Sequence, residues 1–196
     1  RPLKDDDLRW LTQLDCGRTL LTLSPRQATP AQIHELARAG ITVSLGHSEA
    51  SAAEAKAAFA AGARGVTHLY NAMSQLTARQ GGLVGAALTE DCFCGLIADG
   101  EHVGEEALRI ALRMKGPEKI ALVSDAMPPA AGGPDSYSLQ GRKARRHGNR
   151  LELEDGTLAG AAIVMADAVR YLVAKKLASL SDALRMATAT PAQFIG

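Results

Sequence analysis

The sequence predicts an α/β protein built around a parallel β-sheet that is buried on both faces. Two observations support this prediction. Segments of strand type alternate along the chain with segments that carry helix start and stop signals, which is the order of strands joined by crossover helices. The strand segments are continuous apolar runs, as expected where helices cover both faces. The sheet could be open and doubly wound or part of a closed barrel, although a complete (β/α)8 barrel usually takes about 250 residues and this chain has 196.

Five apolar runs are short enough to be strands. The second ends at His47, the third contains His68 close to its end, and the fifth contains Asp125. In a parallel sheet the loops that follow the strands lie on one side, where active sites gather. We therefore expect these three side chains on the same side of the sheet. The five predicted strands span residues 18–24, 41–47, 65–70, 93–100 and 119–127.

Helix signals stand between these strands. Thr29 can cap a helix, Pro30 suits its first position, Gln32 completes a capping box, and Gly40 can end it. A second capping box, with the sequence SAAE, opens an alanine-rich helix that stops near Gly62. The three helices predicted in this part of the chain span residues 29–40, 51–62 and 104–116.

The alternation breaks at residues 128–160, where turn residues and short alternating runs predict a β-hairpin-like excursion. Its basic cluster, residues 142–147, is interpreted as a solvated loop or hairpin. We find no internal repeat and no linker, so residues 1–196 are treated as one domain. Its C-terminal part, residues 161–196, is predicted to be helical, with helices at about residues 161–176 and 181–188 and one starting at 190–194.

Composition excludes several classes of protein. A net charge of +1 gives no broad electrostatic reason to expect a nucleic-acid or acidic-membrane partner. No apolar run is long enough to span a bilayer, and the N-terminus lacks the order of a signal peptide, so a cytoplasmic location is the default expectation. Cys16, Cys92 and Cys94 do not make an even disulfide framework and are predicted to be free thiols, with metal binding by the last two as a minor alternative.

His47 and His68 are candidates for a metal site. Twenty-one residues separate them, which fits one strand-helix-strand step. Neighbouring parallel strands lie about 4.8 Å apart, so both imidazoles could bind one ion at about 2.0–2.1 Å. A histidine at a strand end is more often a hydrogen-bonded polar residue than a ligand, and this alternative stays open for both.

Asp125 could accept hydrogen bonds from loop amides, which is the common role. Beside a bound metal ion it could instead accept a proton from a water whose pKa such an ion lowers from 15.7 to about 7. His102 follows the fourth strand and Arg79 the third, so the first could be an exposed loop histidine or a site residue, and the second a surface arginine or an anion clamp. His34 and His147 have no reason to join the site.

Seven motifs follow one another along the chain: GHSEA, GVTHLYNAM, RQGGLVGAAL, LIADGEHV, LVSDAMPPAAGG, GTLAG and MATATPAQFIG. Their order and spacing, from about residue 10 to the end, resemble those of the N-acetylglucosamine-6-phosphate deacetylases, which belong to the metal-dependent amidohydrolase superfamily. No single motif would suffice, but the combination is specific.

The resemblance implies that the five strands are strands four to eight of a (β/α)8 barrel. It implies that His47 and His68 bind a divalent metal ion, zinc or alternatively iron. Asp125 is then the general base that activates the hydrolytic water and returns the proton to the leaving amine, and Arg79 is the clamp for the sugar phosphate. The substrate-binding residues implied by the resemblance are Asn71, Ala72, Arg79, His102, Leu158, Ala159 and Gly160.

The sequence also departs from the family. The family's third metal ligand is the glutamate of an EGP motif on an earlier strand, and this motif does not occur here. Residues 24–26 replace the family's usual Ala-Pro-Glu, and Ala161 stands where a serine is frequent. We therefore expect the sequence to be a fragment of a longer enzyme, comprising part of its catalytic barrel.

The expected function is hydrolysis of N-acetylglucosamine 6-phosphate to glucosamine 6-phosphate and acetate. The resemblance implies a homodimer as well as a small amino-sugar phosphate as the partner, and neither a nucleic acid nor a membrane. Two alternatives stay open. One is an amidohydrolase that acts on a cyclic amide or another N-acetyl sugar, and the other is a non-catalytic, sugar-phosphate-binding remnant.

Overall fold

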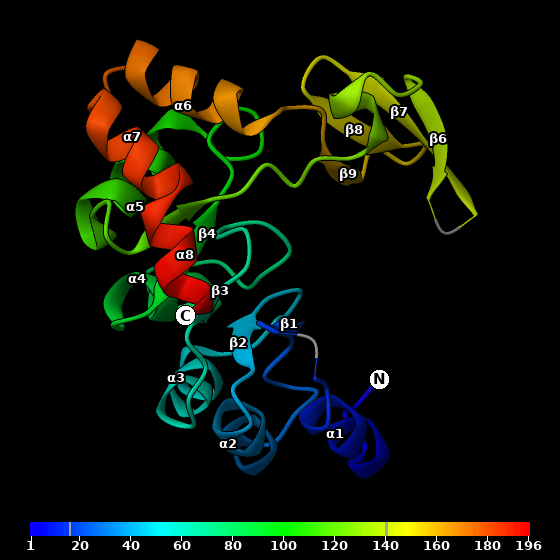
Figure 1. The fold of residues 1–196 in the computed structure, drawn as a ribbon. Helices are drawn as coiled ribbons and strands as arrows, with labels where there is room; N and C mark the ends of the chain where they lie inside the picture. The colour runs from blue at the N-terminus through cyan, green and yellow to red at the C-terminus, as the bar shows by residue number, and fades with distance from the viewer. Residues whose placement is uncertain (16, 140) are drawn as a thin grey trace.

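Two sheets organise the chain. The computed structural model describes residues 1–15, 17–139 and 141–196 (Figure 1). Within them, a five-stranded sheet runs through the body of the molecule, and a four-stranded sheet lies to one side of it, drawn in yellow. Extended segments before and after the smaller sheet join it to the helices of the larger body.

The larger sheet is entirely parallel, and its strands lie side by side in the order in which they occur in the chain. This confirms the prediction of a parallel sheet with crossover helices. Its central strands are buried, and Val43, Leu45 and Leu96 have no exposed surface. The strands are β1 (Leu20–Leu23), β2 (Thr42–Leu45), β3 (Gly65–Val66), β4 (Phe93–Leu96) and β5 (Ile120–Leu122).

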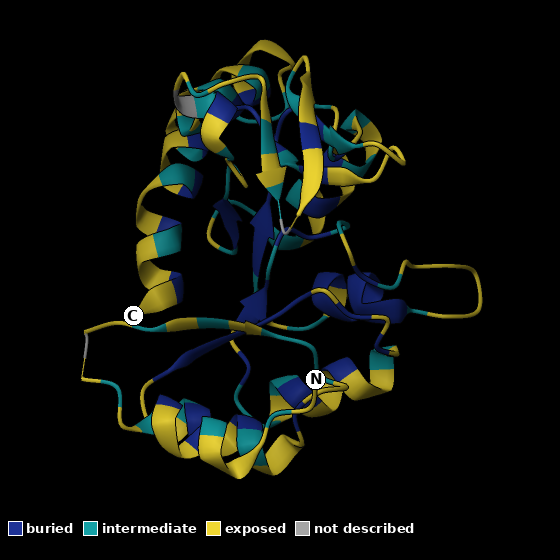
Figure 2. Cartoon of the chain, turned by 90° about the vertical axis from the view of Figure 1, so that its right-hand side faces the viewer, coloured by how far each residue is buried: buried dark blue, intermediate teal, exposed yellow. Residues whose placement is uncertain are grey.

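Helices surround this sheet and turn one face toward it. Ile33 and Leu36 are buried on α2, whereas the outward positions of the helices are exposed, as the yellow bands of Figure 2 show. The predicted capping boxes at Thr29 and Ser51 are both present. The helices before and between the strands are α1 (Asp5–Thr12), α2 (Pro30–Arg38), α3 (Ala52–Ala60), α4 (Gly82–Thr89) and α5 (Glu105–Lys115).

Three further helices end the chain, as predicted for residues 161–196. Of these, α7 and α8 pack against β5 and against each other. The ring of Phe194 stacks on that of Phe93, with 5.1 Å between centroids, and thereby attaches the last helix to the start of β4. The helices are α6 (Met165–Ala174), α7 (Leu180–Ala187) and α8 (Ala189–Ile195).

Two of the described helices, α1 and α4, lie in segments for which no helix was predicted. In α4 every position from Gly82 to Leu88 is buried, so the segment has no polar face and therefore no helical periodicity. A helix buried on all sides cannot be recognised from alternation between apolar and polar residues.

The strands end earlier than predicted. His47, His68 and Asp125 lie just beyond their strands, which corrects the prediction that His47 ends its strand. Their φ angles of 48°, 33° and 50° are left-handed, and a strand cannot continue through such a conformation. The largest difference is at β5, which has three residues where residues 119–127 were predicted, and β3 has two where residues 65–70 were predicted.

The predicted β excursion is a four-stranded antiparallel sheet preceded by a short 3-10 helix, η1 (Pro128–Ala131). It has a small core of its own, formed by Ala144, Leu151 and Ala159. The basic cluster forms one of its strands and is largely exposed, in agreement with a solvated hairpin. The strands are β6 (Ser136–Leu139), β7 (Arg142–His147), β8 (Arg150–Leu153) and β9 (Leu158–Ala161).

Two further predictions concern cysteines and membranes. Cys92 and Cys94 are free thiols, as predicted, and both are buried. Cys16 lies outside the described residues. Within the described part of the chain, no helix has both the length and the apolar character needed to cross a membrane.

Candidate active site

The ends of β2 and β3 bring two histidines face to face. The Nε2 atoms of His47 and His68 lie 2.9 Å apart, and the rings meet edge to face with centroids 4.7 Å apart. The Nδ1 atom of His68 lies 3.0 Å from the carbonyl oxygen of Asn71. Because a carbonyl can only accept, Nδ1 of His68 carries the proton and its Nε2 presents a lone pair toward His47.

This arrangement fits half of a metal site. A divalent ion bound at about 2.0–2.1 Å from each nitrogen can lie between two Nε2 atoms that are this close. The hydrogen bond from His68 to a backbone carbonyl is also the kind of support that metal-binding histidines usually have. Burial lowers the pKa of His47, the neighbouring His68 lowers it further, and Asp125 opposes both, so the unprotonated ligand form is favoured. Within residues 1–15, 17–139 and 141–196, no third histidine, cysteine or carboxylate completes the group.

Backbone strain is concentrated at this site. Six described non-glycine residues have positive φ angles, and five of them are His47, His68, Tyr70, Ala72 and Asp125. Such conformations cost of order 1–3 kcal/mol each and persist where the surrounding structure enforces them. Four of these five are predicted site residues, His47, His68, Ala72 and Asp125, and strain at so many of them points to a functional site.

The surrounding structure holds these conformations through backbone hydrogen bonds. The N–H of Ser48 donates to the carbonyl of Ala72 at 3.0 Å, and the N–H of Ser74 donates to the carbonyl of Ser48 at the same distance. The hydroxyl of Tyr70 donates to the carbonyl of Ala107 on α5 at 3.0 Å, and burial raises the pKa of Tyr70 to about 12. The loop that contains Asn71 and Ala72 is therefore attached both to the loop after β2 and to α5.

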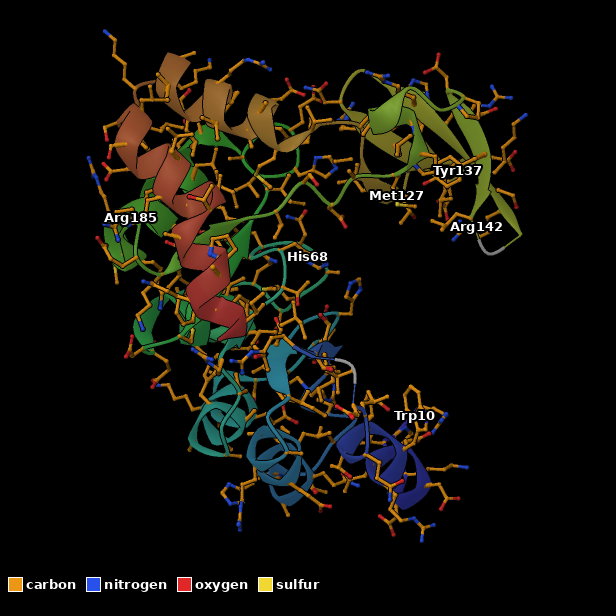
Figure 3. The ribbon with its side chains drawn as sticks, viewed as in Figure 1. Trp10, His68, Met127, Tyr137, Arg142 and Arg185 are labelled. Carbon is orange, nitrogen blue, oxygen red and sulfur yellow. The ribbon has the colours of Figure 1, made fainter. Side chains whose placement is uncertain are left out.

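Asp125 lies on the same side of the sheet. Its side chain is exposed. Its negative charge favours a higher pKa for both His47 and His102, although burial and His68 leave the pKa of His47 lowered. Its backbone is tied to the smaller sheet, since the N–H of Ala161 donates to the Asp125 carbonyl at 2.9 Å. Figure 3 shows His68 near the middle of the molecule, and Met127 and Tyr137 on the sheet that Asp125 leads into.

His102 meets strand β9. Its Nε2 atom lies 3.3 Å from the carbonyl oxygen of Gly160, which joins two elements that sequence reasoning assigned separately to substrate binding. Of the other predicted substrate-binding residues on β9, Leu158 is exposed and Ala159 is buried in the small core.

One candidate, Arg79, lies apart from this group, as do the two histidines that were not expected to join it. Arg79 is exposed on the loop between β3 and α4, and no ion pair joins it to another described residue. His34 is exposed on α2 and His147 is exposed on β7, as expected for residues outside the site. The structure thus brings together His47, His68 and Asp125 with most of the predicted substrate residues, and leaves Arg79 in solvent.

Known proteins are similar to this chain in sequence and in fold. The chain is 45% identical over 189 residues to the N-acetylgalactosamine-6-phosphate deacetylase of Shewanella sp. (strain ANA-3), a match that covers 95% of this chain and 48% of that protein. The crystal structure of N-acetylglucosamine-6-phosphate deacetylase from Pasteurella multocida superposes with a TM-score of 0.94 at 36% identity, over 100% of this chain and 52% of that one. The chain belongs to the N-acetylhexosamine-6-phosphate deacetylase family.

A third relative in this deacetylase family was solved with a sugar phosphate. It is a mutant of the Mycobacterium smegmatis enzyme in complex with N-acetyl-D-glucosamine-6-phosphate, with a TM-score of 0.83 and 30% identity over 90% of this chain and 48% of that one. No family model matches the chain. The chain spans about half the length of the curated relatives it matches.

Sequence reasoning missed two residues of this candidate site. Asp99 lies 2.6 Å from Nδ1 of His102, with both side chains buried, and its place three residues before that histidine was an available signal. The second is Tyr137, whose pKa is raised by burial and by the charge of Asp125. Nothing in the sequence indicates that Tyr137 on β6 lies close enough to Asp125 for this interaction, because the approach depends on how the two sheets are placed.

Proposed function

We propose that the protein hydrolyses the acetamide group of N-acetylglucosamine 6-phosphate, releasing glucosamine 6-phosphate and acetate. The observation that carries this proposal is the facing pair of Nε2 atoms on His47 and His68, with the charge of Asp125 acting on the same group. Family membership supports it independently.

His47 and His68 would hold a divalent metal ion, zinc or alternatively iron. When bound, such an ion polarises the acetamide carbonyl and makes water a better nucleophile at neutral pH. The chain's own contribution is the fixed tautomer of His68, which the Asn71 carbonyl maintains. A catalytic zinc usually has three protein ligands, so we expect one further ligand besides these two histidines.

Asp125 performs the proton transfer. Its carboxylate accepts a proton as the water oxygen adds to the carbonyl carbon, and delivers that proton to the amide nitrogen as the C–N bond breaks. Acetate and a free amine result. The exposure of Asp125 suits this role because substrate must reach it.

The remaining predicted residues bind the sugar phosphate. Asn71 and Ala72 lie on the loop that is hydrogen-bonded to the loop after β2. Leu158, Ala159 and Gly160 lie on β9, and the carbonyl of Gly160 faces His102. Arg79 supplies a guanidinium for the phosphate, a pairing that is often bidentate. Because Arg79 lies in solvent, we expect it to reach the phosphate only after its loop moves or when a second subunit of a homodimer presents it.

The architecture proposed for the whole protein is a (β/α)8 barrel in which β1 to β5 are strands four to eight. Parallel strands in chain order, the first four of which are each followed by an α-helix, support this proposal. Active sites of such barrels lie at the carboxyl ends of the strands, which is where His47, His68 and Asp125 lie.

A second candidate substrate is N-acetylgalactosamine 6-phosphate. The relative at 45% identity carries this specificity in its name, whereas the similar structure from Pasteurella multocida is named for the glucosamine epimer. The two sugars differ only in the orientation of the hydroxyl at C4.

The test measures acetate and free amine released by the whole protein after loading with zinc or iron. Both 6-phosphates are assayed, with unphosphorylated N-acetylglucosamine and a cyclic amide, dihydrouracil, as controls. A preference for one 6-phosphate supports the proposal and decides between the epimers. Preference for dihydrouracil would indicate a different amidohydrolase. Phosphate-dependent binding without hydrolysis under any metal condition would indicate a non-catalytic binding protein.

A further inference from the structure

Asp99 and His102 form a buried pair, of which only His102 is assigned to substrate binding by the proposed function. Both side chains are only 2% exposed, and Oδ2 of Asp99 lies 2.6 Å from Nδ1 of His102. The pair lies on the loop between β4 and α5, on the side of the sheet that carries the candidate site. A carboxylate and an imidazole buried together need a structural or functional reason, because removing charged groups from water is costly.

The other oxygen of the same carboxylate fixes the loop. Oδ1 of Asp99 accepts hydrogen bonds from the backbone N–H groups of Glu101 and His102, both at 2.9 Å. One side chain thus determines both the path of the backbone at His102 and the orientation of its ring. The ring has no freedom to turn while these three contacts hold.

The protonation of His102 follows from its partners. Burial raises the pKa of Asp99, but its hydrogen bonds to His102 and to the loop N–H groups outweigh burial and leave that pKa below its ordinary value. The carboxylate is therefore an acceptor, and Nδ1 of His102 carries a proton. On the other side, Nε2 faces the carbonyl of Gly160, which can only accept, so Nε2 carries a proton as well.

Two carboxylates act on this ring, Asp99 on its own loop and Asp125 after β5, while the smaller sheet contributes the neutral Gly160 carbonyl. Burial alone would lower the pKa of His102. The hydrogen bond and the charge of Asp99 act in the opposite direction and leave the pKa raised. The geometry and the charges agree on a ring with an N–H group at each nitrogen.

We propose that Asp99 is a positioning residue of the active site, which holds His102 as a doubly protonated imidazolium and aims its Nε2–H at Gly160 on β9. The Nε2–H bonds to the Gly160 carbonyl in the free protein and donates to a hydroxyl or phosphate oxygen of the sugar when substrate lies against that strand. This inference rests on the proposed function for the identity of the substrate. The state of the ring itself does not depend on it.

The first experiment measures the ring directly. The protein is labelled with ¹⁵N at histidine, and the resonances of His102 are assigned by their loss in His102→Gln. At pH 7 both ring nitrogens of His102 are expected to give the signature of an imidazolium, and Asp99→Asn is expected to convert the ring to a neutral tautomer. A neutral His102 in the unmutated protein, or an imidazolium that persists in Asp99→Asn, would overturn the proposal.

A matched control separates charge from loop structure. Asp155 also accepts a hydrogen bond from the backbone N–H two residues ahead, that of Thr157 at 3.1 Å, but it lies on the β8–β9 hairpin and touches no histidine. Asp155→Asn should leave the His102 resonances unchanged. If it changes them as Asp99→Asn does, a general loosening of the fold explains the result and the proposal fails.

The second experiment is a double-mutant cycle in the whole, metal-loaded protein. Asp99→Asn should lower kcat/KM for the preferred amino-sugar 6-phosphate by roughly 10- to 100-fold, the usual range for a carboxylate that supports a functional histidine. In the His102→Gln background the same change should have less than about a threefold effect. An undiminished effect in that background would show that Asp99 does not act through His102. If the unmutated protein hydrolyses neither epimer, the proposed function fails and the ring measurement alone decides the positioning role.

Discussion

Residues 68–74 and residues 76–80 are adjacent in the chain but are held in different ways. The first segment contains His68, Asn71 and Ala72, and hydrogen bonds attach it to Ser48 and to α5. The second contains Arg79, is exposed throughout, and is closed mainly by bonds between Thr77 and Gln80. The groups proposed for chemistry are thus fixed in advance, whereas the group proposed for phosphate binding is not. A site divided in this way can keep its reacting groups aligned while substrate enters.

The largest effect is expected where the fixed segment is broken. His68→Ala removes the Nε2 that faces His47 and also the bond to the Asn71 carbonyl, so both the metal and the loop lose support. We expect loss of most bound zinc and of all measurable hydrolysis, as checked by elemental analysis and by acetate release. His34→Ala, an exposed histidine on α2, is the matched control and should keep both. Normal zinc content in His68→Ala would contradict the assignment of this residue as a ligand.

Asp125→Asn tests the chemistry separately from metal binding. The amide cannot accept the proton of the water, so kcat should fall by about 10²- to 10⁴-fold, the range typical of general acid–base catalysis. Zinc content and the unfolding temperature should stay close to those of the unmutated protein, because the side chain is exposed. A fall of less than tenfold would mean that another group transfers the proton.

Arg79→Ala tests the exposed segment, residues 76–80. Loss of a charge-assisted hydrogen bond costs about 1.5–3 kcal/mol, so KM for the 6-phosphate should rise roughly 10- to 100-fold, with little change in kcat. Unphosphorylated N-acetylglucosamine should be hydrolysed as before. The control is Arg113→Ala, an exposed arginine on α5. Equal effects on both sugars would remove Arg79 from the phosphate site.

The smallest effect is expected at Gly160, the residue of β9 that His102 contacts. Gly160 has a φ of 95°, and a Cβ there would lie 2.6 Å from Cγ of Met127, so Gly160→Ala should lower the free energy of unfolding by about 1–3 kcal/mol. Gly156→Ala is the matched control, since φ is 80° but nothing lies within 4 Å. Urea denaturation of both variants measures the difference. Equal losses of unfolding free energy in the two variants would show that β9 can move away from Met127.

Much of the fold follows from local signals. The capping boxes at Thr29 and Ser51 and the continuous apolar strands predict the parallel sheet, because caps and burial are properties of short segments. The helix α4 cannot be predicted from local signals because it has no polar face. The extent of the smaller sheet cannot be predicted in this way either, since the pairing of β8 with β9 depends on contacts between segments, which the hydrophobic pattern of one segment does not contain.

The candidate site, like the fold, is only partly predictable from the sequence. The spacing of His47 and His68 predicts that they lie at the ends of neighbouring strands, and the structure places them just beyond the ends of β2 and β3, which are neighbours. Their left-handed backbone is not predictable, because histidine adopts it more often than most side chains but still uncommonly, and the neighbouring loops impose it. The burial of Asp99 against His102 also depends on the packing of the loop after β4.

The left-handed backbone at His47, His68 and Asp125 has a consequence for how this protein can change over generations. Glycine adopts that conformation more readily than any residue with a side chain, so replacing one of these residues with glycine removes its reactive group and relaxes the main chain at once. Robustness to heat and retention of the site therefore pull in opposite directions at these three positions. A lineage, or a laboratory library, screened for heat resistance alone should drift toward inert descendants that fold better than their ancestor.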